Sequence, residues 1–127
     1  MSKLIYEDLS YKINGCIYQM YNQFGFGYRE KHYQSILAEI FKIEGLKFKK
    51  ECYGKLTFNN TIIAKYFLDF LVEDKIVVEL KVANDFYTQH MSQVISYLKG
   101  NKLQLGIVAL ITKDRIKIKR LINTIYK

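Results

Sequence analysis

The chain has 127 residues, half of them hydrophobic, which is enough for one domain with a core of its own. No apolar run is long enough to cross a membrane, and the first residues lack the layout of a signal peptide. The two cysteines, Cys16 and Cys52, have no zinc-ligand spacing and indicate inert thiols in a reducing compartment. We therefore expect a cytoplasmic protein with no membrane partner.

The formal net charge of +8 favours a polyanionic partner, and nucleic acid is the usual one. Lys and Arg gather in two segments, 47–50 and 113–120, which hold most of the local excess. The alternative is that scattered lysines merely keep a small protein in solution.

Two helices are expected first, because apolar residues recur near the helical period over 4–22 and again over 28–44. The Gly25-Phe26-Gly27 segment separates them, and Gly45 is a natural stop for the second. Glu30 falls in the first turn of the second helix, where the helix dipole favours a carboxylate. Spacing alone favours a surface role for Glu30.

After Gly45 the apolar pattern changes to the period of a strand. Residues 46–58 read as an irregular strand interrupted at Gly54, and Asn59-Asn60 is a hairpin turn signal. Segments 61–72 and 76–82 complete an antiparallel meander. A third helix over 86–98, a buried strand over 103–112 and a basic edge strand over 115–120 follow. The helical crossover favours parallel pairing of the strands on either side of it.

Three charged side chains, Asp69, Glu79 and Lys81, stand within the apolar strands of the meander. A buried charge without a partner costs several kcal/mol, roughly, so these groups must pair, bind a metal or face a cleft. Glu79 and Lys81 share one face because side chains alternate along a strand. If residues 73–75 form the loop, Asp69 opposes Glu79 with Cβ atoms about 4.5–5.5 Å apart. A two-residue turn would instead send Asp69 to the other face.

Two opposed carboxylates repel each other unless one is protonated or a cation lies between them. A hard divalent cation with oxygen ligands is the simplest relief. An internal ion-pair network of Asp69, Glu79 and Lys81 explains the same spacing equally well. Spacing alone leaves both interpretations open.

An ordered set of motifs resembles the PD-(D/E)XK nuclease superfamily, in particular its small GxxExxY proteins. Gly27-Tyr28-Arg29-Glu30-Lys31-His32-Tyr33 matches the helix motif, and the preceding 24–27 segment looks like the family's Gly-Pro-Gly-Leu with the proline replaced. Asp69, nine intervening residues and Glu79-Leu80-Lys81 match the metal-binding pair with its ExK signature. Gln93 to Tyr97 matches QxxxY. The resemblance spans roughly residues 8–121.

The resemblance implies an α/β fold, with a mixed β-sheet flanked by helices, as a single domain over 1–127. It implies a Mg²⁺ or Mn²⁺ site formed by Asp69, Glu79, the Leu80 carbonyl and Glu30. Lys81 would orient and help activate the attacking water and stabilise transition-state charge. The resemblance also implies that Gln93 and Tyr97 contact the substrate phosphate or brace the carboxylates.

We therefore expect a metal-dependent nuclease that hydrolyses phosphodiester bonds in DNA. The alternative is a non-catalytic nucleic-acid-binding module on the same fold, which would use the basic segments 47–50 and 115–120. A third interpretation is a protein-interaction module in which the acidic pocket is only structural. A homodimer would make cleavage of both strands of a duplex easier.

Overall fold

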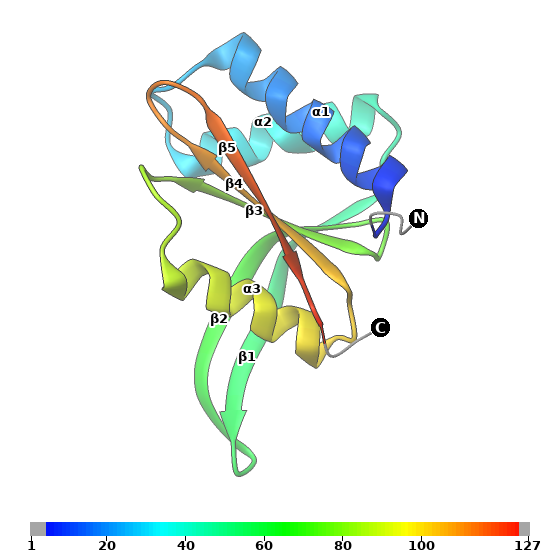
Figure 1. Cartoon of the computed structure of the whole chain (residues 1–127), viewed down its shortest axis with the longest axis vertical. Helices are drawn as coiled ribbons and strands as arrows, with labels where there is room; N and C mark the ends of the chain where they lie inside the picture. Colours follow the sequence, from blue (N-terminus) through cyan, green and yellow to red (C-terminus); the bar gives the residue numbers. More distant parts are fainter. Residues whose placement is uncertain (1–4, 125–127) are drawn as a thin grey trace.

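The computed structural model describes residues 5–124, as three helices and five strands (Figure 1). The helices are α1 (Glu7–Phe24), α2 (Glu30–Ile43) and α3 (Thr88–Gly100). The strands are β1 (Phe48–Phe58), β2 (Thr61–Val72), β3 (Ile76–Val82), β4 (Leu105–Ile111) and β5 (Ile116–Ile122). The predicted elements are confirmed to within a few residues at their ends, although the expected helix start at residue 4 lies outside the described residues. No helix in the described part of the chain is long and apolar enough to cross a lipid bilayer.

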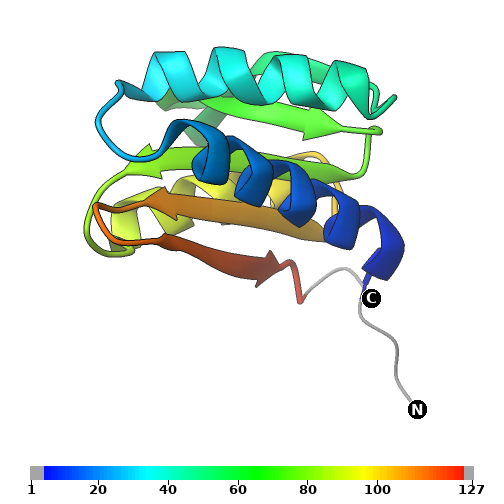
Figure 2. The same cartoon turned by 90° about the horizontal axis from the view of Figure 1, so that it is seen from above.

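The strands form one mixed sheet in the order β1-β2-β3-β4-β5. β3 and β4 pair in parallel, and the other three pairs are antiparallel. A parallel pair needs a long crossover connection, and α3 provides it as expected. Helices α1 and α2 cover one face of the sheet and α3 covers the other (Figures 1 and 2). The predicted α/β class with a mixed sheet between helices is confirmed.

Two hydrophobic clusters hold these layers together. The larger packs α1 and α2 on the sheet and includes Ile17, Phe41 and Phe70, all fully buried. The smaller packs α3 on the opposite face around Val94 and Leu98. Every residue of β4 is buried, as expected for a strand with helices on both faces.

The predicted interruption of the first strand at Gly54 is wrong, because β1 continues through that residue. Gly54 instead makes room for a neighbour, since a Cβ there would overlap the ring of Tyr66 on β2. The irregularities lie elsewhere, at Glu51, whose φ is 53°, and in a register shift between Leu56 and Thr57. A glycine in a strand pattern can thus mark a close approach rather than a break.

The loop between β2 and β3 has the three residues that the opposed carboxylates require. Val72 pairs with Ile76, and Lys75 N donates a hydrogen bond to Val72 O at 3.0 Å. Glu73 and Asp74 both have positive φ, at 54° and 57°, as the central residues of a tight hairpin turn often do. The predicted register is confirmed at this end of the hairpin.

Gly106 allows α3 to pack directly on β4. A Cβ at this position would lie 2.6 Å from Cγ1 of the fully buried Val94. We expect Gly106→Ala to lower the free energy of unfolding by about 1–3 kcal/mol, because Val94 has little room to move. Chemical denaturation measures this loss, and Gly100→Ala, whose added Cβ meets no atom within 4 Å, is the control. Equal midpoints for the two variants would contradict the expectation.

Candidate active site

The hydrogen-bond ladders on both sides of β2 are interrupted at Asp69. Pairing of β2 with β3 runs from Val72 only to Phe70, one residue short of Asp69. Pairing with β1 passes from Lys50↔Phe70 to Cys52↔Leu68 and skips Asp69 and its opposite residue, Glu51. The register is the same on both sides of the break, so no residue is inserted, and the left-handed φ of 53° at Glu51 marks the point where β1 departs from regular pairing.

The side chains of β2 also change from one face of the sheet to the other at this break. Phe70 and Val72 belong to the cluster under α1 and α2, and Leu71 belongs to the cluster under α3. Strict alternation would place Leu68 with Phe70, yet Leu68 lies in the α3 cluster. The change of face occurs at Asp69, so that this carboxyl lies where the sheet opens.

Carboxylate oxygens replace the hydrogen bonds that the interrupted ladder loses. Leu80 N donates to Asp69 Oδ2 at 2.8 Å, and Asp69 N donates to Glu79 Oε1 at 2.9 Å. From α2, Gln34 Nε2 donates to Asp69 Oδ1 at 2.7 Å. The predicted juxtaposition of Asp69 and Glu79 is therefore present, and it is held by the backbone of both strands.

Burial raises the pKa values of both carboxyls. Burial is the larger cause, and with the nearby charge of Glu79 it raises the pKa of Asp69 to about 8. Burial also raises the pKa of Glu79, which is only 3 % exposed. The Lys81 ammonium, 3.5 Å from Glu79 Oε2, works in the opposite direction and lowers both pKa values. At neutral pH the pair therefore disfavours two full negative charges without a cation.

Glu30 reaches the site from the first residue of α2. Its Oε2 accepts a hydrogen bond from Val82 N at 2.9 Å, at the end of β3. It lines the same cleft as Asp69 and Glu79 without joining them as a ligand cluster. Within residues 5–124, no three His, Cys, Asp or Glu side chains converge as a ready metal-binding group. Asp69 and Glu79 therefore lie side by side, and Glu30 lines the cleft beside them.

A cleft of about 410 Å³ opens over these groups. Four of the residues that line it were predicted from the sequence: Glu30, Asp69, Glu79 and Lys81. The other four were not predicted: Gln34, Glu51, Phe67 and Leu68. Gln34 follows Glu30 by one helical turn, and this spacing could have identified it. Glu51 and Phe67 gave no such signal, because their places depend on the break at Asp69.

Gln93 and Tyr97 lie on α3 and are not among the residues that line this cleft. Tyr97 is almost fully buried in the α3 cluster, with its hydroxyl beside the Cys52 thiol. Burial, followed by the neighbouring Cys52, raises the pKa of Tyr97 to about 12. The roles implied for these two residues remain predictions.

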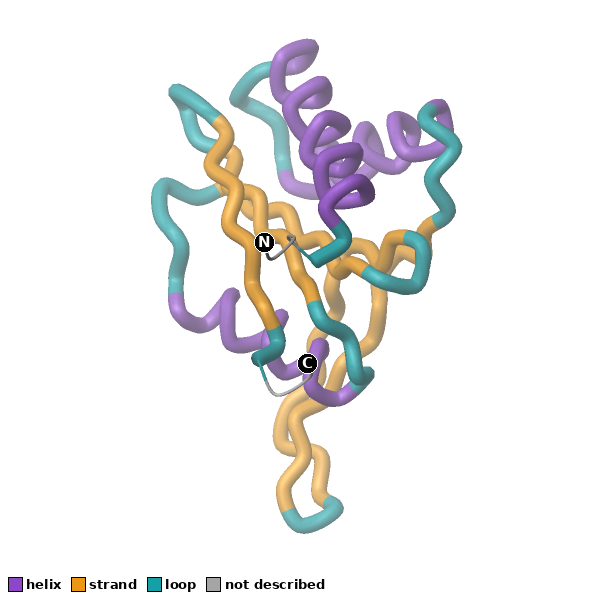
Figure 3. Tube along the Cα trace, turned by 45° about the vertical axis from the view of Figure 1, so that its right-hand side comes forward, coloured by secondary structure: helices purple, strands orange, loops and turns teal. Residues whose placement is uncertain are grey.

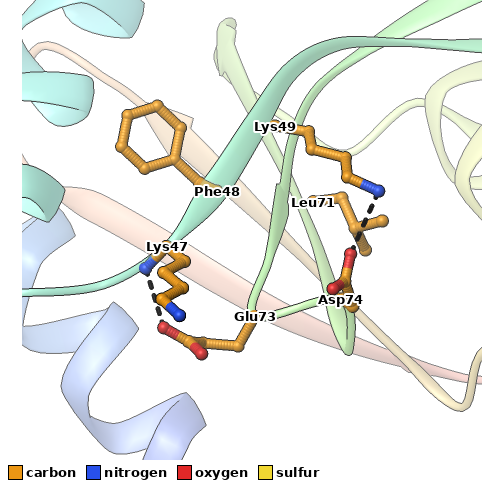
Figure 4. Close-up of a pocket in the computed structure, with 6 residues that line it drawn as sticks. All are labelled: Lys47, Phe48, Lys49, Leu71, Glu73 and Asp74. Carbon is orange, nitrogen blue, oxygen red and sulfur yellow. Dashed lines mark hydrogen bonds and ion pairs between the residues drawn. The ribbon is translucent and has the colours of Figure 1, made fainter.

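A second hollow of about 230 Å³ lies at the β2–β3 turn and is drawn in Figure 4. Its acidic groups are already engaged: Lys49 Nζ lies 3.2 Å from Asp74 Oδ1, and Lys47 N donates to Glu73 Oε2 at 2.7 Å. These contacts join β1 to the turn. Of the basic side chains in 47–50, that of Lys49 is thus paired with a carboxylate of the same chain at the surface. This hollow has no buried carboxylate pair comparable to that of the cleft.

The second basic segment is also partly internal. Arg120 donates to Ser10 Oγ and to Ile5 O, both at 2.9 Å, and so ties β5 to α1. Lys117 Nζ donates to Asn84 O at 3.2 Å. These acceptors are neutral, so the contacts hold the two side chains in place without cancelling their positive charge.

Comparison with known proteins shows the family of the chain. The model of the PD-(D/E)XK nuclease superfamily matches residues 7–121, and the chain belongs to this superfamily. Its members are generally nucleases that act on nucleic acid and typically use divalent metal ions. No curated protein sequence matches the chain significantly.

Three chains of solved structures match, among them the crystal structure of SSO0001. That match has 21% sequence identity and a TM-score of 0.57, and it covers 72% of this chain and 49% of SSO0001. The chain therefore spans about half the length of SSO0001, and the likeness shows the shared fold.

Proposed function

We propose that this protein is a GxxExxY-type nuclease that hydrolyses phosphodiester bonds in DNA with the help of Mg²⁺ or Mn²⁺. The observation that supports this most is the buried pair of Asp69 and Glu79, held together by backbone N–H groups at a break in the sheet. Lys81 beside the pair and the open cleft above it agree with such chemistry.

The donor set of the cleft fits a hard divalent cation. Asp69 and Glu79 supply carboxylate oxygens, which Mg²⁺ and Mn²⁺ prefer. Each oxygen can accept a second partner beside its present hydrogen bond. The raised pKa of Asp69 marks a site where positive charge would be strongly stabilising. Asp69, Glu79 and the Leu80 carbonyl would hold the ion, with Glu30 contributing from the rim.

When bound, the cation would neutralise charge on the phosphate and make the attacking water more acidic. Lys81 shares a strand face with Glu79, and its ammonium would orient that water and stabilise charge developing on the phosphate. Gln34 and the Leu80 N–H fix the orientation of the Asp69 carboxylate through two hydrogen bonds. Gln93 would contact the substrate phosphate or brace the carboxylates from α3, and the buried Tyr97 would brace the site from within the α3 cluster.

Isothermal calorimetry of Mg²⁺ and Mn²⁺ binding, paired with cleavage assays, tests this function. Wild type and Asp69→Asn are compared on plasmid and on single-stranded DNA. Asp74→Asn is the matched control, because Asp74 is an exposed carboxylate outside the cleft. We expect wild type and Asp74→Asn to bind metal and cleave DNA, and Asp69→Asn to do neither. Failure of wild type to bind either metal, or metal-independent cleavage, would refute the proposal.

Gln34 supports the site through Asp69, and its removal should weaken the site without dismantling it. We expect Gln34→Leu to lower metal affinity by about 10–100-fold, the usual cost of losing a hydrogen-bond partner of a metal ligand. Calorimetry measures this change. Gln23→Leu, on the exposed face of α1, should bind as wild type does. Equal affinities for the two variants would show that Asp69 needs no support from α2.

A further inference from the structure

The β1–β2 hairpin extends well beyond the rest of the molecule, below the layer of α1 and α2 (Figures 1 and 3). We call residues 53–67 of this hairpin the arm. The arm carries two lysines and no acidic residue. Its last residue, Phe67, lies two residues from Asp69 and lines the cleft.

One face of the arm packs toward α3 and the other is open. Tyr66 packs on the α3 cluster, and Leu56 lines a hollow with Met91 and Ile95 of α3. Opposed residues of an antiparallel pair share a face, so Tyr53 with Phe67, and Lys55 with Lys65, lie on the other face. That face continues into the cleft, because Phe67 also lines it.

Two aromatic rings mark the boundary between the arm and the cleft. Tyr53 and Phe67 are 46% and 61% exposed, and their ring centroids lie 5.5 Å apart at an interplanar angle of 58°. Rings that only completed the core would be buried against a helix. Exposed rings beside a nuclease cleft match the platforms on which unpaired bases stack.

The next opposed pair on the same face consists of two exposed lysines, Lys55 and Lys65. Like charges directly opposite each other destabilise a sheet, and the arm offers no carboxylate to relieve them. Lys65 stands four residues from Asp69, which is about 13 Å along a strand. An anion bound between the lysines would relieve the repulsion at a short distance from the cleft.

We propose that the arm binds a single-stranded segment of nucleic acid, with bases stacked on Tyr53 and Phe67 and phosphates held by Lys55 and Lys65. The bound strand would lead the scissile phosphate to the Asp69–Glu79 pair. Only unpaired bases expose the faces that such stacking needs, so the substrate is single-stranded or locally unpaired. This inference deepens the proposed nuclease function and rests on it for its catalytic meaning.

Fluorescence anisotropy in EDTA tests binding separately from cleavage. The probes are a labelled short oligodeoxythymidine and a duplex of the same length. We expect the double variant Tyr53→Ala/Phe67→Ala to lose about tenfold to a hundredfold in affinity for the single strand. The double variant Lys55→Gln/Lys65→Gln should reduce the slope of the logarithm of the binding constant against the logarithm of the salt concentration by about 1.4. This is the value expected for losing two phosphate contacts on a single strand. Tyr11→Ala and Lys42→Gln, exposed on α1 and α2, are the matched controls.

Three results would overturn the proposal. They are unchanged single-strand affinity in both arm variants, an equal loss for strand and duplex, and conversion of a wild-type dimer to a monomer by the arm substitutions. The third result would mean that the arm binds a second copy of the chain, and light scattering detects it. Circular dichroism confirms that each variant is folded.

Asp69→Asn separates this proposal from the nuclease function. If the arm variants lose single-strand affinity in EDTA, Asp69→Asn keeps it, and wild type but not Asp69→Asn cleaves, both proposals hold. If wild type cleaves and the arm variants bind as wild type does, the arm proposal fails alone. If Asp69→Asn still cleaves and the arm variants lose binding, the assigned active site fails alone.

Discussion

Lys81→Met is expected to lower the rate of DNA cleavage by a factor on the order of 10³ while metal binding is retained. The substitution removes the ammonium that lies 3.5 Å from Glu79 but leaves Asp69, Glu79 and their backbone hydrogen bonds in place. The loss should therefore fall on kcat, because charge developing in the transition state is no longer stabilised. Single-turnover cleavage at saturating Mg²⁺ measures it.

Lys42→Met provides the matched control, since Lys42 pairs with Glu39 on the exposed surface of α2. It should cleave as wild type does. Calorimetry on the same preparations shows whether Lys81→Met still binds metal. Full activity in Lys81→Met would reduce Lys81 to a structural partner of Glu79, as in an internal ion-pair network.

The stability of the metal-free protein is expected to fall as pH rises from about 4 to about 8. The pKa of Asp69 is raised from 3.8 to about 8, so over this range the folded state binds a proton that the unfolded state has released. The proton stabilises the fold fully below the unfolded pKa, and its contribution is lost as pH rises through the folded pKa. Four pH units correspond to at most about 5 kcal/mol, and the raised pKa of Glu79 acts in the same direction.

Asp69→Asn should remove most of the fall in stability between pH 4 and pH 8, because the amide side chain does not ionise in this range. At pH 8 without metal the variant should therefore be more stable than wild type, even after losing hydrogen bonds worth about 1 kcal/mol. Urea denaturation in EDTA at several pH values measures the effect, with Asp74→Asn as the surface control. Added Mg²⁺ should stabilise wild type and leave Asp69→Asn unchanged. Parallel pH profiles for wild type and Asp69→Asn would contradict the expectation.

The central hairpin could be predicted from the sequence because its constraints are local. Strand alternation placed Glu79 and Lys81 on one face, and a three-residue loop brought Asp69 opposite Glu79. The apolar periods also identified every helix and strand. Such features depend on neighbours a few residues apart, which a single sequence displays directly.

Other parts of the cleft could not be predicted, because they depend on contacts far apart in the chain. Gln34 meets Asp69 only after α2 has packed on the sheet. Glu51 and Phe67 line the cleft because the ladders break on both sides of Asp69, and nothing in the local pattern of β1 indicates a left-handed residue at Glu51. The misassigned break at Gly54 has the same origin, since the close approach of Tyr66 comes from the opposite strand.

The way in which carboxylates replace ladder hydrogen bonds has a consequence for folding order. The bonds that join Asp69 to Glu79 and Leu80 close loops of only 10 and 11 residues, so they can form as the hairpin zips. Gln34 and Glu30 join the site through hydrogen bonds to residues 35 and 52 positions away in the chain. These bonds can form only when α2 packs on the sheet. A local opening of α2 would leave the carboxylate pair intact but lose its support. We therefore expect full metal affinity only in the completely assembled chain, because a partly folded chain would hold its acidic pair without the contacts from α2.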